Sequence, residues 1–242
     1  IIVSINQDGV IGYGEVTVNT YFGITLEMIF DELTRAQHAL MTYELSSPEE
    51  LHQYLLAELE LHNFPLCAID EAAYDWFGKM HEQPTHIYLG SSGLPIPKTD
   101  FTIGIDTMEK MVSKMRNYPW PIYKIKLGTS EDINIVEELR RHTEAIFRVD
   151  ANCGWEAIET IENSKQLARL GVEFIEQPLN PLDVEGMQEV FAHSVLPVIA
   201  DESCLTEDDV ENCVGLFHGI NIKLTKCGGI TPARRMIEHA RF

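Results

Sequence analysis

Two patterns of apolar and polar positions divide the chain. In residues 1–96, an alternating run around Gln7-Asp8-Gly9 predicts a β-hairpin. Three helical stretches follow: Thr25 to Met41, a helix that begins at Ser47-Pro48, and FPLCAIDEAAYDWFGKM, which is apolar almost all round. A hairpin followed by a run of helices is typical of a separate α+β domain.

From residue 97 to residue 242 the pattern changes to short β-rich runs that alternate with amphipathic helical segments. Strands that alternate with helices of this length indicate βαβ units and a parallel sheet. We therefore predict an α/β fold with a (β/α) barrel in which six of the usual eight units are present. The six runs are FTIGID, IYKIKLG, AIFRVDAN, VEFIEQP, LPVIADES and GINIKLT.

Composition narrows the classes of partner. The net charge of −20, from 38 acidic and 18 basic residues, argues against a nucleic-acid partner. The sequence contains no run of about 18 apolar residues that would predict a membrane helix, and no basic leader precedes the first strand. We therefore expect a cytoplasmic protein. The five cysteines form no CxxC pair and are expected to be reduced thiols, with a zinc site as the minor alternative.

Each predicted barrel strand after the first ends with a charged residue among apolar ones. The intervals between these residues are 24, 26, 25 and 22, which is one βα unit each time. We expect all five side chains at equivalent heights at the carboxyl ends of neighbouring strands, where barrel enzymes carry their active sites. In chain order they are Lys126, Asp150, Glu176, Asp201 and Lys223.

The three acids predict a metal site. Three carboxylates cannot share a pocket as anions without a cation, because like charges at close range force protonation. Oxygen ligands suit a hard ion, and Mg²⁺ keeps open positions for substrate. The alternative is that each acid caps the helix after its strand, as Asp201 could do for a helix near Thr206.

The lysines predict proton transfer. In a closed barrel the second and sixth strands lie across from each other, so Lys126 and Lys223 would face one another over the metal. One lysine, with its pKa lowered by desolvation and neighbouring cations, would remove an α-proton next to a carboxylate, and the other would return a proton on the opposite face, as in a racemase or epimerase. Lys124 shares a strand face with Lys126, one step deeper, and would stabilise enolate charge. The alternative is that the lysines only form salt bridges with the acids.

These motifs resemble the enolase superfamily, in which a Lys or His base works beside one or two Mg²⁺ ions. KIK at 124–126, VDAN at 149–152, EQP at 176–178, ADES at 200–203 and NIKLTKCGG at 221–229 are similar to the muconate-lactonizing subgroup. IGYGEV and AIDEAAYDWFGK resemble its capping domain, which we assign to residues 1–96. Within the subgroup, DANCGW and IKLTKCGG are most similar to dipeptide epimerases of the L-Ala-D/L-Glu type.

The resemblance implies Mg²⁺-dependent epimerisation of a dipeptide by 1,1-proton transfer through a metal-stabilised enolate. It implies Mg²⁺ ligands at Asp150, Glu176 and Asp201, with Lys126 and Lys223 as the acid/base pair and Lys124 as the first lysine of the KxK motif. It also implies substrate contacts from Lys124, from Asn152 and from Tyr21 in the capping loop.

The chain departs from the family pattern in several ways. It carries Cys153 where members more often have Gln, and it stops after the sixth barrel strand, before an Asp-x-Asp segment that grips the dipeptide ammonium. It also begins inside a strand without Met, so we expect a piece of a longer protein.

Other functions remain open at this point. They are an o-succinylbenzoate synthase or muconate cycloisomerase, which shares both lysines, and an inactive truncated fragment. A sugar-acid dehydratase of the mandelate type is less favoured, because the sixth strand supplies Lys223 rather than a histidine dyad. The sequence leaves open which dipeptide is the substrate, whether the chain forms a homo-oligomer, and what Lys226 does.

Overall fold

The computed structural model describes residues 1–91, 93 and 95–241, which form two compact units. The first unit comprises Ile1–Pro95, Leu205–Glu207 and Ile222–Phe242, and the second comprises Ile96–Cys204 and Asp208–Asn221. The segment that follows Asn221 therefore groups with the N-terminal part of the chain.

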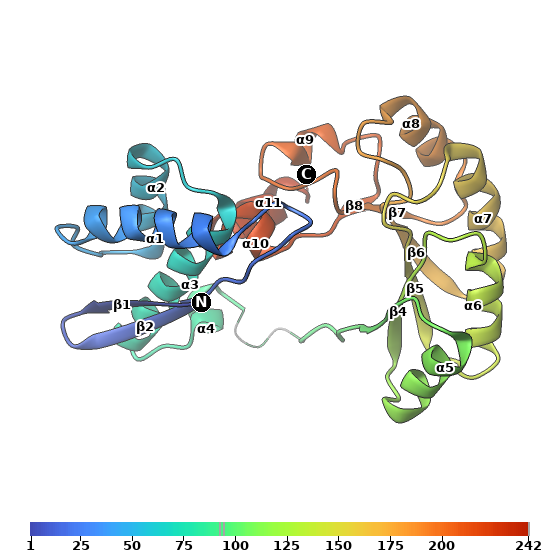
Figure 1. Cartoon of the computed structure of the whole chain (residues 1–242), viewed down its shortest axis with the longest axis horizontal. Helices are drawn as coiled ribbons and strands as arrows, with labels where there is room; N and C mark the ends of the chain where they lie inside the picture. Colours follow the sequence, from blue (N-terminus) through green and yellow to red (C-terminus); the bar gives the residue numbers. More distant parts are fainter. Residues whose placement is uncertain (92, 94, 242) are drawn as a thin grey trace. The chain divides into compact units, whose positions relative to one another are not determined.

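The first unit is an antiparallel hairpin with helices (Figure 1). The register of the hairpin pairs Gln7 with Val10, as the turn residues predict. The helix start predicted at Ser47-Pro48 is confirmed, since the Ser47 side chain caps α2 by accepting from the Glu50 backbone. Thr25 caps α1 in the same way, by accepting from the Met28 backbone. The elements are β1 (Ile2–Gln7), β2 (Val10–Glu15), α1 (Leu26–Leu40), α2 (Pro48–Glu58), α3 (Asn63–Met80), α4 (Thr85–Tyr88), α10 (Leu224–Cys227) and α11 (Ile230–His239).

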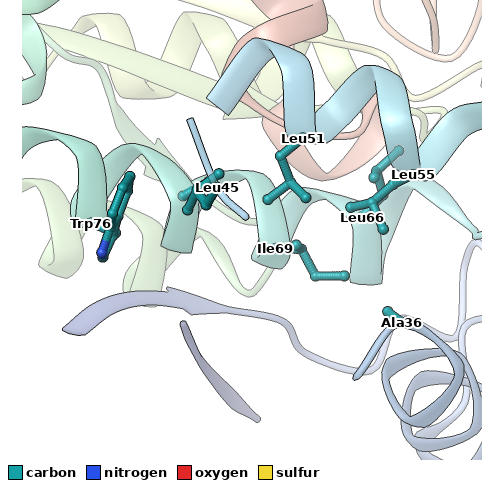
Figure 2. Close-up of a cluster of buried hydrophobic side chains, with 8 residues drawn as sticks. Ala36, Leu45, Leu51, Leu55, Leu66, Ile69 and Trp76 are labelled. Carbon is teal, nitrogen blue, oxygen red and sulfur yellow. The ribbon is translucent and has the colours of Figure 1, made fainter. Parts of the chain in front are cut away.

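Helix α3 is the centre of this unit. It is buried almost all round, as its apolar sequence predicts, and it packs against the hairpin, α1 and α2. Figure 2 shows part of the resulting core, in which Leu51 and Leu55 of α2 lie beside Leu66 and Ile69 of α3. A helix held on several sides in this way is a rigid support for whatever else it contacts.

His52 of α2 is a buried titratable group in the same unit, with 3% of its surface exposed. Burial, helped by the charge of Arg235, lowers the pKa of His52 to about 4, and the Gly228 backbone and Glu207 offset only part of that effect. The folded protein therefore holds this imidazole neutral at pH values where a free histidine would be charged.

We predict that His52 makes the protein less stable as the pH falls from about 6.5 to about 4. In this range the unfolded chain binds the extra proton, so the stabilisation is complete above pH 6.5 and is lost on acidification. The expected loss is about 3 kcal/mol, and it should be absent in a His52→Gln variant. The measurement is the difference in unfolding free energy between the two proteins in urea across this pH range.

The unfolding free energy must be compared between the two proteins because Asp70 has the opposite effect on stability. Burial raises the pKa of its carboxyl to about 6, so its contribution to stability falls as the pH rises. Both proteins contain Asp70, so its effect cancels in the difference. The exposed His193, changed to Gln, is the matched control and should leave the pH profile unaltered. A His52→Gln difference that does not vary with pH would show that the prediction is wrong.

The second unit is a parallel sheet flanked by helices, which confirms the predicted α/β fold. Its six strands, within the described residues, pair in chain order from β3 to β8, and α5 to α8 follow one another along one face (Figure 1). The elements are β3 (Phe101–Ile103), α5 (Met108–Asn117), β4 (Ile122–Lys126), α6 (Asp132–Arg140), β5 (Ile146–Asp150), α7 (Ala157–Arg169), β6 (Val172–Glu176), α8 (Val184–His193), β7 (Val198–Ala200), α9 (Asp209–Asn212) and β8 (Gly219–Ile220).

The last strand is shorter than its sequence predicts. The run GINIKLT suggests a strand through Lys223, but β8 ends at Ile220 and helix α10 begins at Leu224 with Lys223 as its N-cap residue. Apolar residues in a run this short fit a strand or the start of a helix equally well, so the pattern alone could not place the boundary.

Among the described helices, none combines the length and the apolar character needed to cross a bilayer. The five cysteines are all free thiols, as expected from their number and spacing.

Candidate active site

Three of the strand-end charges lie side by side at the carboxyl edge of the sheet. Lys126, Asp150 and Glu176 are the last residues of β4, β5 and β6, and the strand register pairs Lys126 with Asp150 and Asp150 with Glu176. Asp201 directly follows β7, but the register pairs Glu176 with Ile199, so Asp201 lies two residues beyond the position level with Glu176. The prediction of equivalent heights is therefore confirmed for the first three residues.

The fifth charged residue, Lys223, is not level with Asp201 either. β7 pairs with β8 through Ile199–Gly219 and Ala200–Ile220, so the same register continued by one residue puts Asn221, not Lys223, level with Asp201. The Asn221 backbone donates to the Ala200 carbonyl, as a continued ladder requires.

The two lysines of β4 form ion pairs with the buried acids. Lys124 Nζ lies 2.6 Å from Glu176 Oε1 and 2.9 Å from Asp150 Oδ2. Lys126 Nζ lies 2.6 Å from the same Asp150 oxygen. The shared strand face predicted for the two lysines is thus the face that carries the acids.

The charges of this cluster shift its pKa values in different directions. Burial alone would lower the pKa of Lys124, but the charges of Asp150 and Glu176 outweigh burial and raise it, so Lys124 stays an ammonium. Burial raises the pKa of Asp150, but Lys124 and Lys126 reverse that shift and hold it below its usual range. Burial and the charge of Asp150 raise the pKa of Glu176, and Lys124 offsets this only in part.

Asp150, Glu176 and Asp201 also form a set of oxygen donors that fits Mg²⁺. One carboxylate oxygen from each lies within 4.8 Å of the others, and all three residues are buried. Mg²⁺ prefers carboxylate oxygens and leaves positions for substrate, and a cation would relieve the mutual repulsion that raises the pKa of Glu176. The chemistry of this donor set therefore suits the ion that the sequence predicts.

Gln177, which the sequence analysis did not single out, joins the loops that carry two of these acids. It is 1% exposed, and its Oε1 accepts from the Asp201 backbone at 2.9 Å and from the Ser203 backbone at 3.0 Å. Its Nε2 donates to the Ser203 hydroxyl and to the Leu179 carbonyl. The signal that could have identified it is its place beside Glu176, since a buried amide next to a ligand orients its neighbours.

We predict that Gln177→Ala weakens Mg²⁺ binding by about 10- to 100-fold, the usual effect of removing a group that orients metal ligands. The loss follows from releasing the backbone at Asp201. Titration calorimetry with MgCl₂ gives the affinity, and Gln166→Ala, which changes an exposed glutamine of α7, is the control. Equal affinities for the Gln177 variant and the unchanged chain would contradict this role.

The loop after β5 holds Asp150 in place. The Asn152 backbone donates to Asp150 Oδ1 at 3.0 Å, and both Asn152 and Cys153 have a positive φ, of 48° and 62°. Non-glycine residues in this conformation cost energy and are found where a site requires them. Burial raises the pKa of the Cys153 thiol to about 12, helped by nearby carboxylates of which Glu202 contributes most, so the thiol stays neutral. The Asn152 side chain is exposed, and its contact with substrate stays a prediction.

Asn221 is a second residue that the sequence analysis missed. Its Nδ2 donates to Glu176 Oε1 at 2.8 Å, the same oxygen that Lys124 contacts. It lies two residues before Lys223 in NIKLTKCGG, where alternation places the two side chains on one face, so parity along the strand was the available signal.

Lys223 and Tyr21 belong to the first unit. Lys223 is exposed at the start of α10. Tyr21 is 69% exposed, and its ring contacts Phe22 edge-on. Their roles stay predictions. Lys226, left open by the sequence, is 4% exposed within α10.

Comparison with known proteins places the chain in a family. The family described as "Enolase C-terminal domain-like" matches residues 106–241. The "L-Ala-D/L-amino acid epimerase" of Maribacter sp. is 51% identical over 242 residues, which cover all of this chain and 72% of that protein. The chain is therefore shorter than this relative.

Solved structures agree with this placement. The dipeptide epimerase of Enterococcus faecalis V583, complexed with Mg and the dipeptide L-Leu-L-Tyr, is 30% identical with a TM-score of 0.92 over 99% of this chain and 71% of that one. A muconate lactonizing enzyme, 22% identical with a TM-score of 0.91 over 99% of this chain and 71% of that one, shares the fold. The chain therefore belongs to the enolase superfamily, to its muconate-lactonizing subgroup and, within that subgroup, to the dipeptide epimerases, which are isomerases.

Proposed function

We propose that the chain carries out Mg²⁺-dependent epimerisation of a dipeptide by 1,1-proton transfer, with Lys126 and Lys223 as the two acid/base groups. The observation that supports this most is the buried cluster in which Lys124 and Lys126 contact the acids of a Mg²⁺-type donor set. The names of the relatives support the reaction class, since both the Maribacter and the Enterococcus proteins are called epimerases.

Asp150, Glu176 and Asp201 would hold the metal ion. Bound Mg²⁺ would draw charge from the substrate carboxylate and thereby raise the acidity of the neighbouring C–H. Lys124 remains an ammonium, because its two acid partners raise its pKa, and it would stabilise negative charge that develops on the substrate.

The acid/base lysines would divide the reaction between the two epimers. The neutral amine of one lysine removes the α-proton from one epimer, and the ammonium of the other donates a proton to the carbon from the opposite side. The same pair works in reverse from the other epimer. Tyr21 and Asn152 are proposed to contact the dipeptide away from the reacting carbon.

Proton NMR in D₂O with Mg²⁺ tests the proposal on a panel of L,L-dipeptides that includes L-Ala-L-Glu and L-Leu-L-Tyr. We expect the α-proton signal of one residue to disappear while the diastereomer accumulates, and the panel member that reacts identifies the substrate group. Circular dichroism on the same sample would check that the chain is folded.

The alternatives give different results in the same experiment. A folded chain that binds Mg²⁺ but exchanges no α-proton would overturn the epimerase assignment for this chain. It would then be tested as a muconate cycloisomerase or an o-succinylbenzoate synthase. A chain that binds no Mg²⁺ and exchanges no α-proton would instead be an inactive fragment.

A further inference from the structure

The segment that begins at Lys223 lies directly on helix α3, and two polar side chains of α3 bind it. The first is Asn63, whose Nδ2 donates to the Lys226 carbonyl oxygen at 2.6 Å. The carbonyl oxygen of Lys223 in turn accepts from the Lys226 and Cys227 backbones, at 2.9 and 3.2 Å. Asn63 is thus connected to the backbone of Lys223 through a single turn of α10.

The second side chain is Asp70, which caps a helix to which it does not belong. It is 2% exposed and accepts from the Thr231 backbone at 3.0 Å and from the Thr231 hydroxyl at 2.6 Å. Helix α11 begins at Ile230 after Gly229, and a glycine at the N-cap has no side chain to accept from the first backbone donors. Asp70 supplies the missing acceptor from α3.

Two glycines allow this close approach. Gly228 and Gly229 have φ values of 99° and 131°, a conformation that favours glycine. A Cβ on Gly228 would lie 3.3 Å from Leu66 Cδ2, and a Cβ on Gly229 would lie 2.4 Å from Asp70 Oδ2. Asn63, Leu66 and Asp70 are three and four residues apart, so they share one face of α3. That face and the glycine turn fit together without room for side chains.

We propose that Asn63 and Asp70 are positioning residues for Lys223. The proposal rests on the acid/base role proposed above for Lys223. Lys223 is an exposed residue at a helix start, and its backbone direction is set by the turn that follows it. Asn63 binds the Lys226 carbonyl before the glycine turn, and Asp70 binds Thr231 after it. The turn is therefore held at both ends on a rigid helix, which fixes the backbone position from which the Lys223 side chain extends. An error of about 1 Å in the position of a reacting group can cost about 100-fold in rate.

The test separates the two epimers of the substrate. If the two lysines serve opposite epimers, a Lys223→Ala variant identifies the epimer that depends on Lys223. Asn63→Ala and Asp70→Ala should then slow α-proton exchange of that same epimer by about 10- to 100-fold in kcat and leave the other epimer at its original rate. Asp70→Asn, which keeps one acceptor oxygen, should restore part of the rate. General destabilisation would slow both epimers together, and that result would overturn the proposal.

A second measurement does not depend on activity. Amide hydrogen exchange of residues 223–231 should become faster in both alanine variants, while exchange in strands β4 to β6 stays unchanged. Asp183→Ala is the matched control, because it removes an aspartate that caps a different helix through the Gly186 backbone at 2.9 Å. It should alter neither the exchange of residues 223–231 nor the balance between the epimers.

The outcomes distinguish this inference from the proposed function. Unchanged amide exchange of residues 223–231 in both variants would overturn the inference whatever the activity. If the protein without any substitution exchanges the α-proton of neither epimer, that result would overturn the proposed function and the catalytic part of this inference. The amide exchange would still decide whether α3 holds the segment.

Discussion

Replacing Lys126 with alanine is expected to lower the rate of α-proton exchange by about 10²- to 10⁴-fold, the usual contribution of a positioned acid or base. Its amine sits at the carboxyl edge of the sheet, 2.6 Å from Asp150 Oδ2, with 30% of the side chain exposed. The amine is therefore paired with a carboxylate that is proposed to bind the metal ion, and it is still accessible to a substrate. Exchange measured by NMR for each epimer separately gives the effect.

Lys126→Arg decides between a base and a salt bridge. Arginine would keep an ion pair with Asp150 but does not lose its proton in proteins, so it cannot act as a base. We expect this variant to bind Mg²⁺ normally and to exchange as slowly as the alanine variant. Lys165→Ala, which removes a surface lysine paired with Glu162 on α7, is the control and should be fully active. An active Lys126→Arg protein would favour the purely electrostatic alternative.

The sequence predicted the acidic part of the site because one physical rule controls it. Parallel strands separated by one helix each present their last residues at one edge, so regular intervals between charged residues placed Asp150 and Glu176 correctly beside Lys126. The same rule gave Lys124 its place, since residues two apart in a strand share a face. These features depend on local periodicity alone.

The rule failed at the last two strands. The ladder between β6 and β7 pairs Glu176 with Ile199, so Asp201 lies two residues beyond the level of Glu176. The interval of 22 residues before Lys223 also looked regular, but the ladder between β7 and β8 is offset by 20, which brings Asn221 rather than Lys223 to the level of Asp201. A shift of two residues in strand register is not visible in a pattern of apolar runs. Register is set by pairing with the neighbouring strand, which a single sequence does not contain.

Contacts between distant segments were also beyond the pattern. Asp70 is one of several polar positions in a mostly apolar helix, and nothing in the neighbouring sequence identifies Thr231, 161 residues later, as its partner. Only a buried aspartate among apolar neighbours signals that some donor must exist, because burying an unpaired carboxylate is costly. The glycine pair at 228 and 229 marks a turn but not the helix on which it lies.

Asp150→Asn is expected to abolish detectable Mg²⁺ binding and to lower α-proton exchange on the order of 10³-fold. The metal contributes several kcal/mol to stabilising developing charge, and each 1.36 kcal/mol is tenfold in rate. Asp150 accepts from three donors: its Oδ2 accepts from Lys124 and Lys126, and its Oδ1 accepts from the Asn152 backbone. Asparagine has the same shape, so the loss would reflect charge.

Thermal unfolding gives a readout of Asp150→Asn that is independent of activity. Mg²⁺ at about 100 times its dissociation constant should stabilise the unchanged chain by about 2.7 kcal/mol and should leave the variant unstabilised, because a ligand stabilises only the folded state that binds it. The chelator EDTA should reverse the gain. Asp208→Asn, at an exposed position before α9, is the matched control and should respond to Mg²⁺ like the unchanged chain. An Asp150→Asn protein that Mg²⁺ still stabilises would mean that the buried acids serve the lysines rather than a metal.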